Sequence, residues 1–304
     1  MNLKQLSYFQ SVASQGCITT AANQMNVAQS ALSHQIASLE ADLGVQLLIR
    51  HARGVTLTRP GEVLLDHARQ IRSHCDQARR DVRDAADIAG EVTIGIPVSM
   101  ASVLTLPLLQ ALEDGLPRAQ VHVFEGLTGD LRGWLRLGKI ETGILYGNEQ
   151  TDGLSLEPLA EDELVLFGKS DGIGDNTASI PFGSLGAHPL YTTDGDHPVR
   201  PLLTRLAKQH RVSLHFGAQI NSVHQLKALA REGRGHTILP RVALAREAPE
   251  LCDCLRSIEP PIKLSSYIAT MPNPNTRVQS VQRILRDVVE RLIHAGDWPG
   301  AVML

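Results

Sequence analysis

A run of short polar side chains near the front of this chain has residue types that suit hydrogen bonding to nucleic acid. On a helix that begins at Gln29, the side chains of Ser30, Ser33 and His34 project away from the apolar positions. Amide, hydroxyl and imidazole groups at a helix N-terminus suit base edges and phosphates in a major groove. The alternative is a merely solvated face, but such a face usually carries Lys and Glu, and this helix has neither before Glu40.

A second set of polar side chains follows strand-like segments farther along the chain. Ser99 comes just after VTIGI, Thr128 has the equivalent place after VHVFEG, and Thr193 ends PLYTT. Open α/β sheets bind ligands beyond the carboxyl ends of their strands, where hydroxyls and backbone N–H groups suit an anion. With Met100 beside Ser99, and Arg200 as a positive charge on the loop after Thr193, these residues form our candidate small-ligand site. The alternatives are ordinary helix capping by the hydroxyls and an ion pair between Arg200 and a nearby Asp.

Catalytic and metal-binding spacings are not found in the sequence. Its 12 histidines are scattered, and no GxSxG, HExxH or GxxxxGK[ST] pattern is present. The segment GRGH, residues 233–236, lacks the third glycine of a dinucleotide loop. Cys252 and Cys254 form CxC with no second half-site at metal spacing. We therefore expect no enzyme activity, no cofactor and no metal.

Length and composition indicate a globular protein with more than one core. The chain has 304 residues, four cysteines and a formal net charge of -3. Residues 1–59 are mildly basic, with a net charge of +2, so the remainder sums to -5. The N-terminus does not resemble a signal peptide, and no stretch approaches the ~20 apolar residues of a membrane helix. We expect a cytoplasmic protein that is not bound to a membrane.

The elements that position the first polar set are short helices. We expect helices over residues 3–13, 18–25 and 29–43 and a strand over 55–58. In the third helix Leu32, Ile36, Leu39 and Leu43 share one face and should point into a core. The small side chain of Ala22 lets the preceding helix approach closely. Two helices joined by so short a turn form a helix-turn-helix.

A long helix should follow, from Thr58 as N-cap to about Ala89. Apolar and small residues recur alternately four and three positions apart along it, which is the spacing of a coiled-coil seam. The seam includes Leu64, Ile71, Cys75 and Val82, which we take as candidate dimerisation residues. The alternative is that this helix packs only on its own domain.

After Gly90 strand-like and helix-like segments alternate, which predicts a mainly parallel sheet covered by helices. The alternation occurs twice, with the second series starting near Glu161, so two α/β lobes are expected.

The chain resembles the LysR-type transcriptional regulators. The likeness lies in LKQLSYF, TTAANQMNVAQSALSHQIASLEADLGVQLLIR, RGVTLTRPGE and GRGHTILP, which occur in order along the whole chain. The last segment is similar to the nitrogen- and sulfur-assimilation branch. The resemblance implies that the positions of Gln29, Ser30, Ser33 and His34 contact DNA from the recognition helix.

The resemblance also implies that Arg50 and Arg53 contact phosphates and the minor groove from the wing. Two positions depart from the family pattern, because Ser30 stands where Pro is usual and Cys17 where Ser is usual. The start of the recognition helix and the cap of the helix before it are therefore expected to be less rigid than in the family.

The resemblance implies a fold class as well: an N-terminal all-α winged helix-turn-helix with a long linker helix, followed by a two-lobed α/β effector domain similar to periplasmic binding proteins. The expected domains are residues 1–58, 59–89 and 90–304, with lobe I at 90–160 and 267–295 and lobe II at 161–266. Expected partners are double-stranded DNA with an interrupted dyad site, a small effector of anionic character, further copies in a homodimer or homotetramer, and RNA polymerase. The alternative function is a ligand sensor whose front domain no longer binds DNA.

Overall fold

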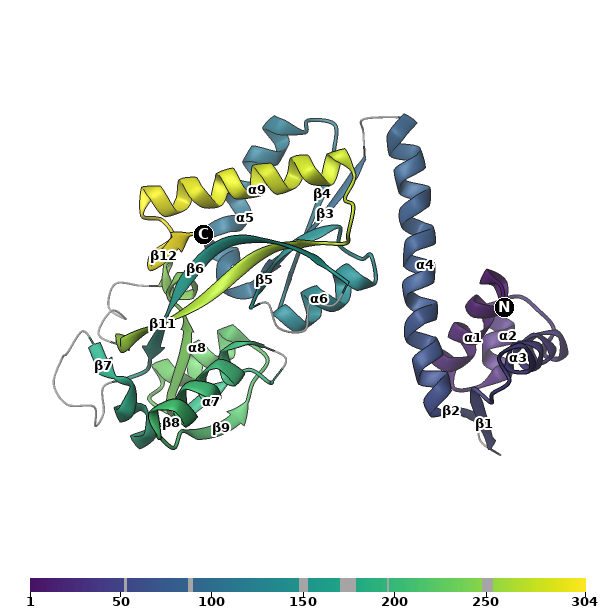
Figure 1. Cartoon of the computed structure of the whole chain (residues 1–304), viewed down its shortest axis with the longest axis horizontal. Coiled ribbons are helices and arrows are strands. Elements are labelled where there is room, and N and C mark those ends of the chain that lie inside the picture. The colour runs from purple at the N-terminus through teal and green to yellow at the C-terminus, as the bar shows by residue number, and fades with distance from the viewer. Residues whose placement is uncertain (52–53, 87–89, 148–152, 170–178, 196, 248–253) are drawn as a thin grey trace. The chain divides into compact units, whose positions relative to one another are not determined.

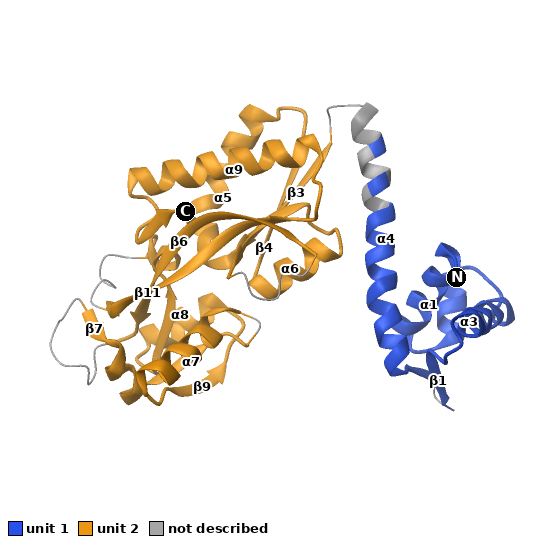
Figure 2. Ribbon diagram, viewed as in Figure 1, with its two compact units in different colours: residues 1–85 blue, residues 86–304 orange. Residues whose placement is uncertain are grey.

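The structure, a computed structural model, forms two compact units (Figure 2), residues Met1–Ala85 and Ala86–Leu304. It describes the whole chain except residues 52–53, 87–89, 148–152, 170–178, 196 and 248–253. Arg53, Cys252 and the predicted end of the long helix at Ala89 therefore lie outside the described residues. None of the described helices has both the length and the apolar character needed to cross a membrane.

The N-terminal unit contains three short helices, a two-stranded hairpin and one long helix. Its elements are α1 (Leu3–Gln15), α2 (Ile18–Gln24), α3 (Gln29–Leu43), β1 (Leu48–His51), β2 (Gly54–Leu57) and α4 (Arg59–Ala86). The hairpin is the wing. The winged helix-turn-helix and long linker helix expected from the sequence are therefore present.

The turn between α2 and α3 depends on one left-handed residue. Asn26 has φ of +52°, a conformation that Asn tolerates better than most residues. This allows the N–H of Val27 to donate to the carbonyl of Ala22 at 3.0 Å and places the Val27 side chain against the core. The chain can then start α3 in a new direction after only a few residues.

The inner face of α3 is buried as predicted at three of its four apolar positions, which are 0 % exposed: Leu32, Ile36 and Leu39. The fourth prediction was wrong, since Leu43 is 38 % exposed. The helix ends there because Gly44 adopts a left-handed conformation, with φ of +70°, and turns the chain away. Leu47, 1 % exposed, provides the next buried side chain instead.

The long helix α4 starts where the capping residue Thr58 predicts. The Thr58 hydroxyl accepts a hydrogen bond from the N–H of Gly61 at 3.1 Å and donates to the carbonyl of Gln46 at 2.7 Å. One residue thus caps α4 and ties its start to the turn before the wing. Such caps stabilise a helix by roughly 1 kcal/mol.

The second unit is built on one mixed sheet of ten strands with helices packed around it (Figure 1). The strand order is β4-β3-β5-β11-β6-β10-β8-β9, with β12 paired to β6 and β7 to β11. Its elements are β3 (Glu91–Pro97), α5 (Val98–Gly115), β4 (Gln120–Gly126), α6 (Thr128–Arg136), β5 (Thr142–Tyr146), β6 (Ser155–Phe167), β7 (Ser179–Pro181), η1 (Phe182–Ala187), β8 (Pro189–Thr192), α7 (Val199–His210), β9 (His215–Gln219), α8 (Val223–Arg231), β10 (His236–Pro240), η2 (Arg241–Leu244), β11 (Leu255–Thr270), α9 (Thr276–Ala295) and β12 (Ala301–Met303).

Two long antiparallel strands, β6 and β11, join the two lobes. The parallel strands β3, β4 and β5 belong to one lobe, and the parallel strands β8, β9 and β10 to the other. In Figure 1 both long strands run from one lobe into the other. The two-lobed α/β architecture is confirmed. The proposed lobe limits at 160 and 266 fall inside these strands and stay predictions, as do the other domain limits.

The apolar core of this unit is continuous between the lobes. It contains Ile94 and Ile144 from the first lobe and Leu190 and Leu203 from the second, all 0 % exposed. Since β6 and β11 contribute to the same cluster, a movement of one lobe relative to the other has to bend these strands within a packed interior.

Candidate DNA-binding and effector sites

The N-terminal part of α3 presents polar side chains at the surface of the unit. Gln29, Ser30 and His34 are exposed, and Ser33 is half-buried. Ala28 is the N-cap of α3 and makes no side-chain cap hydrogen bond. The N–H groups of the first turn are therefore not capped by the N-cap side chain, and they add donor capacity to this surface.

The wing contributes a guanidinium to the same surface. Arg50 lies on β1, and its Nη1 donates to the hydroxyl of Ser33 at 3.2 Å. This contact joins the wing to the recognition helix, which the sequence did not show. Across the hairpin, His51 Nε2 lies 3.0 Å from the Thr56 hydroxyl.

The wing is held close to α1 by a contact that requires glycine. The N–H of Val55 donates to the carbonyl of Gly16 at 2.8 Å. Gly54 has φ of +143°, and a Cβ built on it would lie 2.4 Å from the same Gly16 oxygen. Any other residue would push the wing away from the helices. Glu40 fixes the base of the wing, since its carboxylate accepts from the N–H groups of Leu47 and Leu48 at 2.8 and 3.1 Å.

The candidate dimerisation residues differ along α4. Leu64 packs against the core of its own unit, as the alternative interpretation predicted for the whole helix. Ile71 and Cys75 are half-buried, and Val82 is 73 % exposed. The seam residues therefore contact the core of the N-terminal unit at the start of α4, and in its second half the apolar side chain of Val82 is left exposed.

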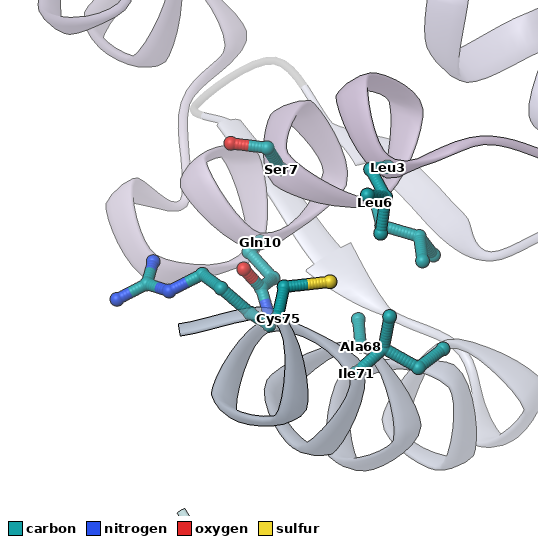
Figure 3. Close-up of a pocket in the computed structure, with 8 residues that line it drawn as sticks. Leu3, Leu6, Ser7, Gln10, Ala68, Ile71 and Cys75 are labelled. Carbon is teal, nitrogen blue, oxygen red and sulfur yellow. The ribbon is translucent and has the colours of Figure 1, made fainter. Parts of the chain in front are cut away.

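A pocket of about 310 Å³ lies beside the middle of this seam. Figure 3 shows it between α1 and α4, with Leu3 and Leu6 on one side and Ile71 and Cys75 on the other. Leu3 is 56 % exposed. An apolar side chain from another molecule would bury Leu3 and Ile71 together.

In the second unit, Ser99 and Thr128 lie in the first turns of α5 and α6 but do not cap them. The N-cap residues are Pro97 and Leu127, so the capping alternative does not explain the two hydroxyls. Ser99 is 6 % and Thr128 2 % exposed. The Thr128 hydroxyl is buried without a hydrogen-bond partner among the described residues. A buried, unsatisfied hydroxyl is unfavourable unless a ligand or water completes it.

The remaining sequence candidates lie in different surroundings. Met100 is 0 % exposed and packs inside the apolar core, so its assignment to ligand contact gains no support and stays a prediction. Helical periodicity explains this, because Ser99 and Met100 are neighbours and project in different directions. Thr193 is 4 % exposed, directly after β8. The guanidinium of Arg200 lies 4.7 Å from the centre of the Phe216 ring, a cation–π contact that directs it to the edge strand β9.

Two residues at this junction were not anticipated from the sequence. Tyr146 ends β5, and the Ser99 hydroxyl donates to its Oη at 3.5 Å. His197, from the turn before α7, lies with its ring 6.3 Å from the Tyr146 ring. Burial lowers the pKa of His197 to about 4, opposed by the charge of Asp194, so the ring is neutral at physiological pH. A lone Tyr and a lone His give no spacing signal in a sequence.

The lobes touch at this junction. Val98 and Leu127, which start α5 and α6, pack against a cluster of the other lobe formed by Val223, Leu226, Leu239 and Ala243. A Cβ on Gly147, which follows β5, would approach the Pro198 side chain to 3.2 Å. The hydroxyls of Ser99, Thr128 and Tyr146 are thus enclosed where the two lobes meet.

Comparison with known proteins gives consistent matches over the whole chain. Residues 3–62 match the family model described as bacterial regulatory helix-turn-helix protein, lysR family, and residues 85–290 match the LysR substrate binding domain. The nitrogen assimilation regulatory protein nac of Klebsiella aerogenes is 33 % identical over 300 residues, covering 96 % of both chains. Its namesake in Escherichia coli (strain K12) is 30 % identical over 294 residues and 95 % of both chains.

Among solved structures, the chain is similar to CbnR, a LysR family transcriptional regulator. The TM-score is 0.67 at 23 % identity, with 95 % of this chain and 99 % of the other covered. At that identity the likeness supports the fold alone.

Proposed function

Because the chain belongs to the LysR family of DNA-binding transcriptional regulators, which are not enzymes, we propose that it binds a dyad-symmetric DNA site as a dimer in the cytoplasm. A small acidic effector changes the affinity or geometry of that binding. The observation that carries the DNA-binding part is the asymmetry of α3: Gln29, Ser30 and His34 are exposed on one side, while Leu32, Ile36 and Leu39 on the opposite side are buried. The full-length likeness to two nitrogen assimilation regulators supports target genes in nitrogen metabolism.

Base reading is assigned to Gln29 and His34, with Ser30 and Ser33 beside them. Gln29→Ala should cost about 1–3 kcal/mol of discrimination at the base pair that it contacts. Arg50 and Arg53 supply the backbone and minor-groove contacts, and Arg53→Ala should weaken binding to all sequences and reduce its salt dependence. Quantitative footprinting over a salt series separates the two effects.

Gln46→Ala is the matched control, since Gln46 is exposed in the turn before the wing and, among the described residues, its hydrogen bond with Thr58 is made by the backbone carbonyl, which the substitution keeps. Wild-type footprints for both the Gln29 and Arg53 variants would contradict the assignment, whereas the absence of any footprint from the wild type would favour a sensor that does not bind DNA.

Pairing of two chains is assigned to the second half of the α4 seam and the pocket beside it. A partner helix would cover Ile71, Cys75 and Val82, whose exposure is otherwise unexplained. The double variant Ile71→Glu, Val82→Glu would bury charge in the interface and should be monomeric by light scattering. Arg69→Glu, on the outer side of the same helix, should remain dimeric. A dimeric double variant at micromolar concentration would refute the pairing. Assembly into tetramers and contact with RNA polymerase stay predictions from the family.

The effector is assigned to the buried hydroxyls where the lobes meet, and its class to small anions. Ser99 and Thr128 each lie in the first turn of a helix, where backbone N–H groups favour an anion, and the Thr128 hydroxyl has no partner among the described residues. An effector that binds one arrangement of the lobes better than the other by about 1–3 kcal/mol suffices for a useful switch.

Titration calorimetry with sulfate and with acetate tests this assignment. The double variant Ser99→Ala, Thr128→Val should lose anion binding and the anion-dependent change in DNA footprint, and should keep ligand-free DNA binding. Thr105→Val removes from α5 another buried hydroxyl that has no hydrogen-bond partner in the described part of the chain, and it should leave both anion binding and the footprint change as in the wild type. Equal anion affinity in the wild type and the double variant would place the effector elsewhere.

A further inference from the structure

A buried polar chain leads from the effector site to one of the strands that join the lobes. Ser99 donates to Tyr146 at 3.5 Å, and Tyr146 in turn faces the carboxyl group of Asp162 on β6. Trp298, which follows α9, donates its indole N–H to Asp162 Oδ1 at 2.7 Å. Asp162 is 0 %, Trp298 1 % and Tyr146 2 % exposed. An ionisable group is thus enclosed behind the proposed anion site, and the effector function above does not use it.

The Asp162 carboxyl is incompletely satisfied. The second oxygen, Oδ2, is buried and has no hydrogen-bond partner among the described residues, although the Tyr146 hydroxyl is close enough to lower the pKa of the carboxyl group. Burial raises the pKa of Asp162 to about 7, against the lowering effect of the Trp298 and Tyr146 donors. Both protonation states are therefore populated near neutral pH.

The charged groups on the surrounding elements do not neutralise Asp162. On β6, Glu163 pairs with Arg241 of η2 at 2.8 Å and Glu161 with Lys263 of β11 at 3.2 Å. His197, on the other side of Tyr146, is neutral because its pKa is lowered to about 4. The charge of Asp194 acts on this His197 ring. Tyr146 is therefore the group through which Asp162 communicates with the anion site.

The protonation state of Asp162 determines the direction of the hydrogen bonds. Each hydroxyl has one proton to donate. When Asp162 is charged it can only accept, so Tyr146 donates to it and Ser99 donates to Tyr146. When Asp162 is protonated, it can donate to Tyr146, which can then donate to Ser99. The Ser99 proton is then free for an anion at the start of α5, and no negative charge lies behind that anion.

We propose that Asp162 is a positioning residue of the effector site, which acts through Tyr146 to switch Ser99 between acceptor and donor, so that an acidic effector binds together with one proton. This inference rests on the effector site proposed above and adds its regulation by pH. Binding transfers one proton from solvent to the Asp162 carboxylate, and no other bond is made or broken.

Proton-linked binding can be measured on the full-length protein with sulfate, which stays fully ionised across the neutral range. From about pH 6 to about pH 8.5, wild-type affinity for sulfate should fall about thirtyfold, because a proton must be taken up above the pKa of Asp162, which is about 7. Calorimetry in two buffers of different ionisation enthalpy should show uptake approaching one proton per sulfate above neutral pH.

Asp162→Asn tests the carboxyl group directly. The Asn amide can donate permanently to Tyr146 while its oxygen still accepts from Trp298, so sulfate should bind at all pH values with the affinity that the wild type has at low pH. Proton uptake should be absent. Glu161→Gln removes a neighbouring carboxylate on the same strand and should keep the wild-type pH profile.

Tyr146→Phe removes the relay hydroxyl and keeps the Asp162 carboxyl group, and it decides the question if the Asn variant does not fold. Its pH effect on sulfate affinity should shrink to less than about threefold, the part left for direct charge repulsion. A wild-type profile in Tyr146→Phe, proton uptake retained in Asp162→Asn, or no pH dependence in the wild type would each overturn this inference and leave the effector site standing. Failure of the wild type to bind either sulfate or acetate at any pH would overturn the site as well.

Discussion

The burial of Asp162 should make the stability of the effector unit depend on pH in a way that Asp162→Asn removes. The ordinary pKa of this carboxyl is 3.8, and burial raises it to about 7 in the folded protein. Between these values the folded protein keeps a proton that the unfolded chain has released. Folding stability attributable to this group is therefore greatest at low pH and is lost as the pH rises through the window.

The size of the effect follows from the two pKa values. Integrating the proton difference between about pH 5 and about pH 8 gives a loss of about 2.5 kcal/mol from this one group. Since Asn has nearly the same shape and can keep the Trp298 hydrogen bond, the variant should lack that loss. The free energy of unfolding of the variant minus that of the wild type should therefore rise by about 2.5 kcal/mol across the range.

Urea unfolding followed by tryptophan emission measures this difference, because both tryptophans of the chain, Trp134 and Trp298, belong to the second unit. Using the difference between two proteins cancels the pH dependence of all other groups. The same series on Glu161→Gln should be flat. A flat difference for Asp162→Asn would show that Asp162 is charged throughout, and would refute the account of its burial.

Four further substitutions, one of them a control, test other parts of the structure. Gly54→Ala should destabilise the N-terminal unit by about 1–3 kcal/mol in thermal unfolding followed by circular dichroism, because the new Cβ meets the Gly16 carbonyl at 2.4 Å; Gly44→Ala, with open space around its Cβ, should cost about 1 kcal/mol. Glu40→Ala leaves two wing N–H groups without their acceptor and should cost about 1–3 kcal/mol and weaken DNA binding in a gel-shift assay. The free energy of unfolding of the wild type should fall by about 2.5 kcal/mol between about pH 7 and about pH 4.5, because the buried His197 ring, with a pKa of about 4, resists the protonation that the unfolded chain undergoes. His197→Gln should remove this fall in urea unfolding. The same fall in the variant as in the wild type would contradict the burial of His197.

Local pattern alone was sufficient for most of the N-terminal unit. Helix α3 occupies the predicted residues 29–43, and three of its four side chains expected to face DNA are exposed, because helical periodicity separates an apolar face from a polar one whatever the tertiary context. The prediction that Leu43 is buried was wrong because its burial depends on where Gly44 turns the chain away from the core. The contact of Arg50 with Ser33 joins residues on different elements, and a sequence contains no record of such a contact.

In the effector unit the sequence determined the alternation of strands and helices and the hydroxyls at the strand ends. The tertiary structure decided what surrounds them. The structure places Met100 in the core and the guanidinium of Arg200 over the Phe216 ring. It also places Tyr146 and Asp162 beside Ser99 in one buried group. Propensity and spacing act over a few residues, so they specify single helices and strands. The position of Asp162 behind Tyr146 depends on the pairing of β6 with β11 and of β11 with β5. These are contacts between strands far apart in the sequence. Burial, and with it the protonation of a carboxyl group, is a property of those long-range contacts.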